Sequence, residues 1–212
     1  MRTFFRRLAR VVIWPRTTMR EILDGSRDRA IVPLLLLATL AAFSGDANNN
    51  VRKGLAATPY AWLIVICALI VSALVMFLAF YLFSWMAYVA GRFLEGQGSQ
   101  AAVRSALAWG LAPLIWAILY RIPAALFVPR DTDMIQAGNA AFRINPGLMG
   151  GGCVLALIFG LLELTTFVAY VVVTSRTLAE AHRYSAWKGL GTLVIVGIAP
   201  IVIIIAAVLA IH

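Results

Sequence analysis

Long apolar runs without charge constrain the fold of this chain more than any other feature. Five of them can be read along the 212 residues, at 30–45, 59–90, 106–128, 148–174 and 189–211. A helix needs about 20 apolar residues to cross the hydrocarbon core of a bilayer, and all but the first run meet that length. Only 13% of the residues are charged, about half the share usual in soluble domains. The sequence therefore predicts an all-α integral membrane protein, a five-helix transmembrane bundle.

Basic residues flank these runs unevenly, and this predicts the orientation of the chain. With the N-terminus inside, the inner segments 1–29, 91–105 and 175–188 carry thirteen basic residues, and the outer segments carry five. Cytoplasmic loops are the ones enriched in Lys and Arg. We therefore expect a cytoplasmic N-terminal arm, 1–29, followed by a transmembrane domain, 30–212, whose C-terminus lies outside.

The source and the processing of the chain can be judged from two further features. Its cationic residues are 16 Arg and 2 Lys, a skew typical of GC-rich bacterial genomes, so we expect a bacterial cytoplasmic (inner) membrane. The stretch LLLLATLAAFSGDA resembles the apolar region of a secretory signal with a cleavage site after it. The segment 1–29, which precedes the first apolar run, looks structured, so we expect this stretch to stay in the protein as the first span.

The N-terminal arm contains an amphipathic helix at residues 2–12. On a helical wheel its arginines share one arc, and its apolar side chains fill the opposite arc. Such a helix lies flat on a membrane, with its apolar face at the acyl chains and its arginines at anionic headgroups. The alternative is that the arm is only an orientation signal. The predicted lipid-interface residues are Arg2, Phe4, Phe5, Arg6, Arg7, Leu8, Arg10 and Trp14.

A second short helix is expected in the arm after the amphipathic one. Pro15 breaks or restarts a helix, because its fixed φ suits a first helical position. The new helix should run to about Asp24 and end at Gly25, a residue common just after helix ends.

Catalytic and metal-binding patterns are missing from the sequence. It contains no HExxH, GxSxG, Walker A or GxGxxG motif, and no cysteine or histidine spacing typical of a metal site. His182 and His212 lack partners nearby in sequence and are expected to be solvated, and Cys67 and Cys153 are expected to be buried thiols. The net charge of +9 has no nucleic-acid motif beside it. We predict a protein that is not an enzyme, without a metal, a cofactor or a nucleic-acid partner.

Glu163 is the one acidic residue within the predicted spans. A charge in that place is costly, so the side chain must face the bundle, be protonated, or both. It is either a proton or cation site of a transporter or a structural group that ties two helices together by hydrogen bonds. Arg121 lies roughly 25 Å along a helix from Arg104, so we expect it at the outer interface and not beside Glu163.

The stretch GRFLEGQGSQ, residues 91–100, joins the second run to the third. Gly96 and Gly98 allow the chain to reverse, and Ser99 can cap the following helix. Pro113 should kink the third span, and Gly110 allows another helix to approach it closely.

Three stretches of this chain resemble the Yip1 family of five-span membrane proteins. They are IWPRTTMREIL (13–23), GRFLEGQGSQAAVRSALAWGLAP (91–113) and TSRTLAEAHRYSAWKGLG (174–191). The resemblance implies five spans, a glycine-rich turn after span two and a proline in span three. The residues that carry these motifs are Gly91, Gly96, Gly98, Gly110 and Pro113.

The resemblance and the residues together give two functional hypotheses. Eukaryotic members of the family are implicated in vesicle trafficking, but the Asp-Leu-Tyr-Gly-Pro step that they carry before span one is absent here. The leading hypothesis is a non-enzymatic membrane adaptor or organiser. It would bind membrane lipids, with anionic headgroups at the arm, and other membrane proteins or a second copy of itself. The alternative is a small transporter or channel that uses Glu163.

Overall fold

The computed structural model describes residues 2–25, 30–42, 60–127 and 146–211, and every regular element in these ranges is an α-helix. The prediction of an all-helical fold is therefore confirmed. In chain order the helices are α1 (Arg2–Ile13), α2 (Pro15–Asp24), the helix Ile31–Ala42, α4 (Ala61–Phe93), α5 (Gln100–Gly110), α6 (Ala112–Trp116), α7 (Ile118–Phe127), α9 (Pro146–His182) and α10 (Ala186–Ile211).

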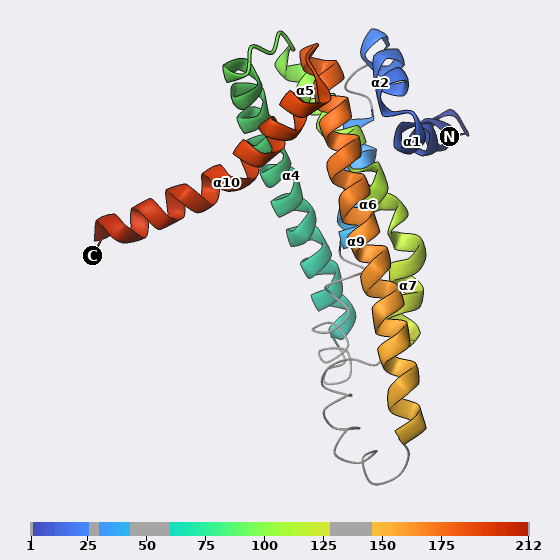
Figure 1. Ribbon diagram of the computed structural model, residues 1–212. Coiled ribbons are helices and arrows are strands. Elements are labelled where there is room, and N and C mark those ends of the chain that lie inside the picture. The colour runs from blue at the N-terminus through green and yellow to red at the C-terminus, as the bar shows by residue number, and fades with distance from the viewer. Residues whose placement is uncertain (1, 26–29, 43–59, 128–145, 212) are drawn as a thin grey trace.

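The long helix α9 is the axis of the fold (Figure 1). It packs against α5, α6 and α7 along its length, and against α2 and α10 near its C-terminal end. α4 contacts α5 and α10. One end of the molecule contains α2, the turn between α4 and α5, and the C-terminus of α9. We call it the polar end. α10 leaves the bundle from this end and points away from it (Figure 1).

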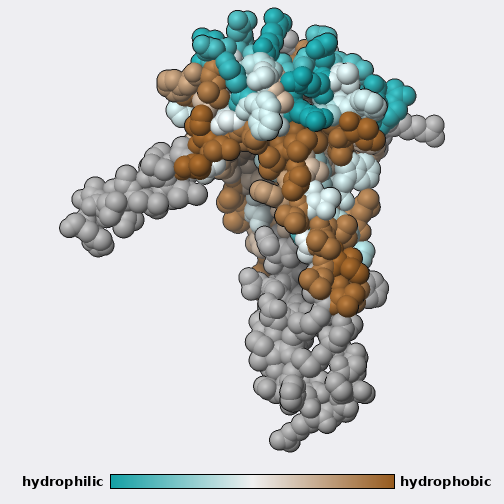
Figure 2. Space-filling view, viewed as in Figure 1, coloured by the Kyte–Doolittle hydropathy of each residue, from teal (hydrophilic) through white to brown (hydrophobic). Residues whose placement is uncertain are grey.

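Hydrophilic side chains gather at the polar end, and apolar side chains cover the surface below it (Figure 2). Three helical stretches are long and apolar enough to cross a membrane, namely Trp62–Phe93, Gln100–Pro123 and Leu157–His182. Ile31–Ala42 and Ala186–Ile198 are shorter apolar helices. The chain is therefore a membrane protein, and the count of five spans remains a prediction.

Several helices extend beyond the predicted spans at the polar end. The fourth predicted span ends at residue 174, whereas α9 continues to His182. The third begins at 106, whereas α5 begins at Gln100, where the Ser99 side chain accepts a hydrogen bond from the amide of Ala102, as expected of an N-cap. Apolar runs therefore identify the membrane-embedded part of a helix, and the helices themselves end later, at caps and turns.

The third predicted span is divided into α5, α6 and α7. Pro113 lies in the first turn of α6, directly after the break between Gly110 and Ala112. A proline there cannot donate the backbone hydrogen bond that a continuous helix needs. The predicted kink at Pro113 is confirmed.

The hydrophobic core lies toward the polar end and includes part of the arm. Leu8 and Val11 of α1 and Met19 and Ile22 of α2 are buried there, together with Trp109 of α5. α2 begins at Pro15 and ends before Gly25, as the sequence predicts. The arm is thus a folded part of the bundle and packs against its helices.

Away from the polar end, α4 and α9 expose large apolar side chains. Leu74, Leu78 and Leu157 are each about two-thirds or more exposed. In a membrane these faces contact the lipid tails, which are as apolar as the side chains, so their exposure costs no free energy there. Cys67 belongs to the same surface of α4 and is exposed, so the expectation of a buried thiol is wrong for it. The side chain of Cys153, and residue His212, lie outside what the structure describes.

Candidate functional site

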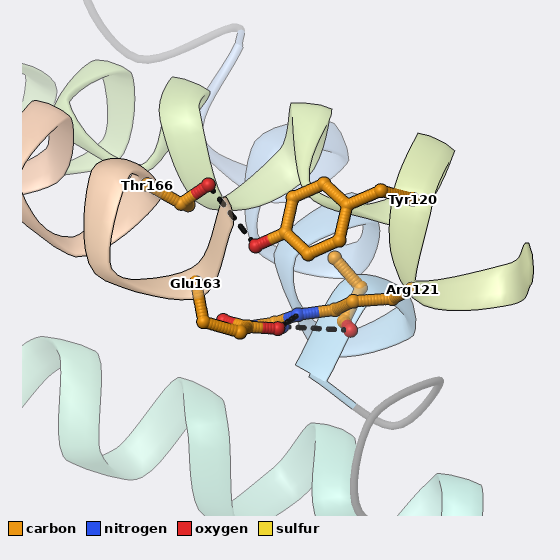
Figure 3. Close-up of polar contacts among 5 residues, drawn as sticks. Tyr120, Arg121, Glu163 and Thr166 are labelled. Carbon is orange, nitrogen blue, oxygen red and sulfur yellow. Dashed lines mark hydrogen bonds and ion pairs between the residues drawn. The ribbon is translucent and has the colours of Figure 1, made fainter. Parts of the chain in front are cut away.

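An ion pair between Arg121 and Glu163 joins α7 to α9 within the apolar part of the bundle (Figure 3). The Nε of Arg121 donates to Oε1 of Glu163 at 2.7 Å, and its Nη2 donates to Oε2 at 2.8 Å. This two-point contact matches the planar guanidinium to the planar carboxylate, the strongest geometry available to such a pair. The charges of Arg121 and Glu163 therefore neutralise each other within the bundle.

Two neighbours complete the cluster around this pair. The Nη1 of Arg121 donates to the backbone carbonyl of Ala41, at 3.1 Å, at the end of the helix Ile31–Ala42. The hydroxyl of Tyr120 donates to Oγ1 of Thr166 at 3.0 Å. The cluster thereby joins three segments of the chain, and it holds α7 to α9 by side chains from both helices.

The expectation that Arg121 lies away from Glu163 is wrong, and the reason is one of depth. At 1.5 Å per residue, Glu163 lies about 28 Å from the His182 end of α9, and Arg121 about 31 Å from the Gln100 end of the α5–α7 segment. The two residues are thus level. A fourth span that ended at residue 174, as predicted, would place Glu163 about 12 Å closer to the polar end than α9 does.

The ion pair also limits the chemistry open to Glu163. A carboxylate that accepts two hydrogen bonds from one guanidinium is held in its charged form and oriented at both oxygens. Within the described ranges, no group of three or more His, Cys, Asp or Glu side chains could hold a metal ion. The cluster is arranged as a tie between helices.

A second polar assembly lies at the polar end, where the stretch 91–100 encloses His182. We call it the glycine clasp; it consists of Gly91, Gly96, Gly98 and the His182 ring. A Cβ on Gly91 would meet the ring at 2.3 Å, and a Cβ on Gly96 would meet it at 2.4 Å. A Cβ on Gly98 would instead meet the Ala181 carbonyl at 2.4 Å. The three glycines are required because α9 approaches the turn so closely.

His182 is fully buried in this clasp, so the expectation of a solvated histidine is wrong. Its ring stacks on Tyr184, with centroids 5.1 Å apart and planes 3° from parallel. Neither ring nitrogen forms a hydrogen bond within the described part of the chain, although the backbone of Ala87 approaches the ring. The backbone carbonyl of His182 accepts a hydrogen bond from the amide of Gln97 at 3.0 Å, which fastens the turn to the end of α9.

The chain reverses at Glu95, whereas the sequence indicates Gly96 and Gly98. Glu95 has φ 66°, whereas none of the described glycines has a positive φ. The amide of Gly96 donates to the carbonyl of Gly91 at 2.8 Å, and that of Glu95 to Arg92 at 3.1 Å, the pattern of a Schellman helix end. The left-handed position is thus occupied by Glu95, and Gly96 follows it.

Small residues on α5 receive the polar side chains of α9. The hydroxyl of Thr174 donates to the carbonyl of Gly110 at 3.3 Å, and that of Thr177 donates to Ala106 at 3.1 Å. A Cβ on Gly110 would lie 2.6 Å from Oγ1 of Thr174. The predicted close approach at Gly110 is therefore present, and the helix that approaches is α9.

The predicted lipid-interface residues of the arm do not all face outward. Leu8 is buried in the core, and Phe4 is partly buried, with its ring 5.7 Å from that of Trp109. Phe5 and Trp14 are 50% and 64% exposed, and Arg6 and Arg7 are also exposed. Arg10 pairs with Glu21 of α2 at 3.2 Å, and the side chain of Arg2 lies outside the described residues. Contact with lipid remains a prediction for the exposed members.

Sequence reasoning missed Arg121 as the partner of Glu163 and His182 as the centre of the clasp. Arg121 could have been found, because an intramembrane acid calls for a base at the same depth on a neighbouring helix. His182 carried a weaker signal, three glycines within the eight residues 91–98, which indicates that another segment approaches the turn closely.

Comparison with known proteins gives the family. The family model of the Yip1 domain matches residues 9–209, nearly the whole chain. No curated protein and no solved structure gives a significant match. The chain belongs to the Yip1 domain family, as the resemblance of its three motifs implied.

Proposed function

We propose that this member of the Yip1 domain family is a non-enzymatic membrane adaptor or organiser of a bacterial inner membrane. The observation that carries the proposal is the Arg121–Glu163 ion pair. Glu163 is the acid that a transport mechanism would need, and its two oxygens are both engaged by one guanidinium. Groups engaged in this way favour a fixed bundle that presents surfaces to lipid and to partner proteins.

The polar end is the cytoplasmic face in this proposal, and the five apolar segments cross the membrane. The exposed aromatics Trp14, Phe93 and Trp187 support this placement, since all three lie near the polar end and such side chains gather at membrane interfaces. The exposed arginines Arg6 and Arg7 then lie where anionic headgroups attract basic residues.

The lipid contact of the arm can be measured by hydrogen exchange on the full chain. Each basic residue near an anionic membrane surface contributes about 1 kcal/mol. Arg6 and Arg7 together should therefore slow exchange of the α1 amides about 30-fold when nanodiscs of phosphatidylcholine are replaced by nanodiscs with phosphatidylglycerol. The double variant Arg6→Glu and Arg7→Glu should lose this difference. Equal exchange of wild-type α1 in both lipids would contradict lipid contact by the arm.

Arg10→Gln is the matched control for that experiment. Its guanidinium pairs with Glu21, so it lies in the same helix but is already engaged within the protein. Its loss should speed exchange of α1 similarly in both lipids, because it removes a contact between α1 and α2. A loss of lipid dependence as large as that of the Arg6 and Arg7 variant would show that the effect is not specific to the exposed face.

The second candidate function is a small transporter or channel. It is favoured by one observation, an ionisable pair set among apolar helices, since such pairs also mark ion pathways. It predicts that Glu163→Gln abolishes a proton or sodium flux into proteoliposomes while the protein stays folded. The adaptor proposal predicts no flux above that of empty vesicles for either protein, and lower thermal stability for Glu163→Gln, because Arg121 loses its partner. A wild-type flux that Glu163→Gln removes would contradict the adaptor proposal.

A further inference from the structure

A groove of about 750 Å³ opens at the polar end, between α2, the turn after α4 and the C-terminus of α9. Three arginines line it, Arg16 and Arg20 from α2 and Arg183 from the end of α9. Gly98 and Ser99 form the wall on the side of the turn. The groove is distinct from the exposed arginines of α1 and from the ion pair of Arg121.

The guanidinium groups of the groove are only partly compensated by acids. Arg20 donates to Oε1 of Glu180 at 2.8 Å, and the pKa of Arg20 is raised by this contact first and also by the charge of Asp24. Among the residues that the structure describes, Arg16 and Arg183 form no ion pair. Two guanidinium groups therefore remain available to an anion in the groove.

Arg183 occupies its place in a conformation that costs free energy. Its φ is 59°, in the left-handed region where glycine is the usual residue. It stands at the end of α9, where its amide donates to Glu180 and the amide of Tyr184 donates to Ala179, the Schellman pattern. An arginine in such a position points to a role for its side chain, because the backbone alone would favour glycine.

The wall opposite α2 is fixed by the glycine clasp. The amide of Gln97 is bound to the carbonyl of His182, and Gly98 lies so close to Ala181 that no side chain fits between them. The Ser99 side chain is engaged with the amide of Ala102. The groove is therefore formed before any ligand arrives, which lowers the cost of binding.

In the membrane placement proposed above, on which this step rests, the groove lies at the depth of lipid phosphates. Trp14 directly precedes α2, Phe93 ends α4, and Trp187 is in the first turn of α10, and all three are strongly exposed. Exposed aromatics mark the headgroup level of a membrane. The arginines lie beside this belt, and the guanidinium fork matches phosphate oxygens in geometry and charge.

We propose that this groove binds a phosphate group, held by Arg16 and Arg183, with Arg20 fixed beside them by Glu180. The phosphate belongs to an anionic phospholipid or to a free phosphate compound in solution. The proposal goes beyond the lipid contact of the arm and does not depend on it, because it uses other residues.

Two probes separate the two sources of phosphate. The full chain is placed in phosphatidylcholine nanodiscs at 0.15 M salt, and its Tm is followed with added inorganic pyrophosphate. In parallel, nanodiscs that contain phosphatidic acid are analysed by native mass spectrometry for retained lipid. Stabilisation by pyrophosphate assigns a soluble phosphate, selective retention of phosphatidic acid assigns a lipid, and both together assign a site open to either source. If the wild type shows neither effect, the proposal is overturned.

Arg183→Gly is the decisive variant, because it removes a guanidinium and relieves the backbone at the same position. Without ligand its Tm should equal or exceed that of the wild type, so weaker phosphate binding by this variant would not result from unfolding. Its affinity for the phosphate probe should fall about tenfold or more, the usual loss for a hydrogen bond to a charged group. Arg16→Gln should show the same loss. Wild-type affinity in both variants would overturn the proposal, and so would an equal loss in Arg6→Gln, which changes the same charge outside the groove.

Discussion

Replacing Gly91 by alanine tests the glycine clasp with a single methyl group. The new Cβ would lie 2.3 Å from both Cε1 and Nε2 of His182, more than 1 Å inside ordinary contact distance. The ring is fully buried between Gly91, Gly96 and Tyr184, so it has little room to move away. Overpacking of this kind costs about 1–3 kcal/mol.

Gly160 of α9 supplies the matched control for this substitution. It is exposed, and a Cβ there would meet nothing within 4 Å. Alanine in a helix is favoured over glycine by about 0.5–1 kcal/mol, and both glycines lie in helices, so this gain is largely common to the two variants. The difference between Gly91→Ala and Gly160→Ala should therefore equal the cost of the clash, about 1–3 kcal/mol.

Thermal unfolding of the two variants in the same detergent measures this difference. A change of 1 kcal/mol moves the Tm of a chain of this size by about 2–4 °C, so Gly91→Ala should melt about 2–12 °C below Gly160→Ala. Removing the ring with His182→Ala should reduce the effect of Gly91→Ala, because the methyl group then fills vacated space. Equal melting temperatures for the two alanine variants would refute the close packing of the clasp.

Three further predictions concern the helix ends and the seam between α5 and α9. Arg183→Gly should stabilise the protein by about 1 kcal/mol, since it relieves a left-handed arginine, and a lower Tm than the wild type would show that the backbone there is not strained. The pKa of Glu95 is held below its ordinary value, first by its hydrogen bond to Lys188 and then by that residue's charge. The contact therefore stabilises the folded state at pH values above the unfolded pKa of Glu95. This stabilisation is lost as pH falls through the lower folded pKa. In Lys188→Met, NMR titration should find the pKa of Glu95 shifted upward, and an unchanged value would rule out the contact. Gly110→Ala should lower the Tm by forcing Thr174 aside, whereas Gly197→Ala, with open space around it, should not. Similar Tm values for these two variants would contradict a tight seam.

Local signals in the sequence were enough to predict the helices and several of their ends. Pro15 and Gly25 bound α2, Ser99 caps α5 and Pro113 lies in the first turn of α6, because each acts through its own backbone geometry or side chain. The Yip1 resemblance likewise rested on local motifs and is confirmed by the family match. The effect of a residue on the helix that contains it can be predicted from the sequence, because it requires no contact with a distant segment.

Features that depend on contacts between distant segments could not be predicted in the same way. Arg121 and Glu163 are 42 positions apart, and their pairing depends on where α9 ends, which the apolar run does not reveal. His182 lies far along the chain from Gly91, so the sequence shows the glycines and the histidine but not their contact. Amphipathicity alone also does not tell whether Leu8 faces lipid or protein, because an apolar helix face is stabilised by contact with either one.

The measurement that tests the adaptor proposal most directly is a flux assay on proteoliposomes of the wild-type protein and Glu163→Gln, with melting of both proteins followed in parallel. The account predicts no proton or sodium flux above that of empty vesicles for either protein, and a lower Tm for Glu163→Gln, since Arg121 then lacks the carboxylate that engages it. A flux through the wild type that disappears in a folded Glu163→Gln would contradict it and identify the ion pair as part of a transport pathway.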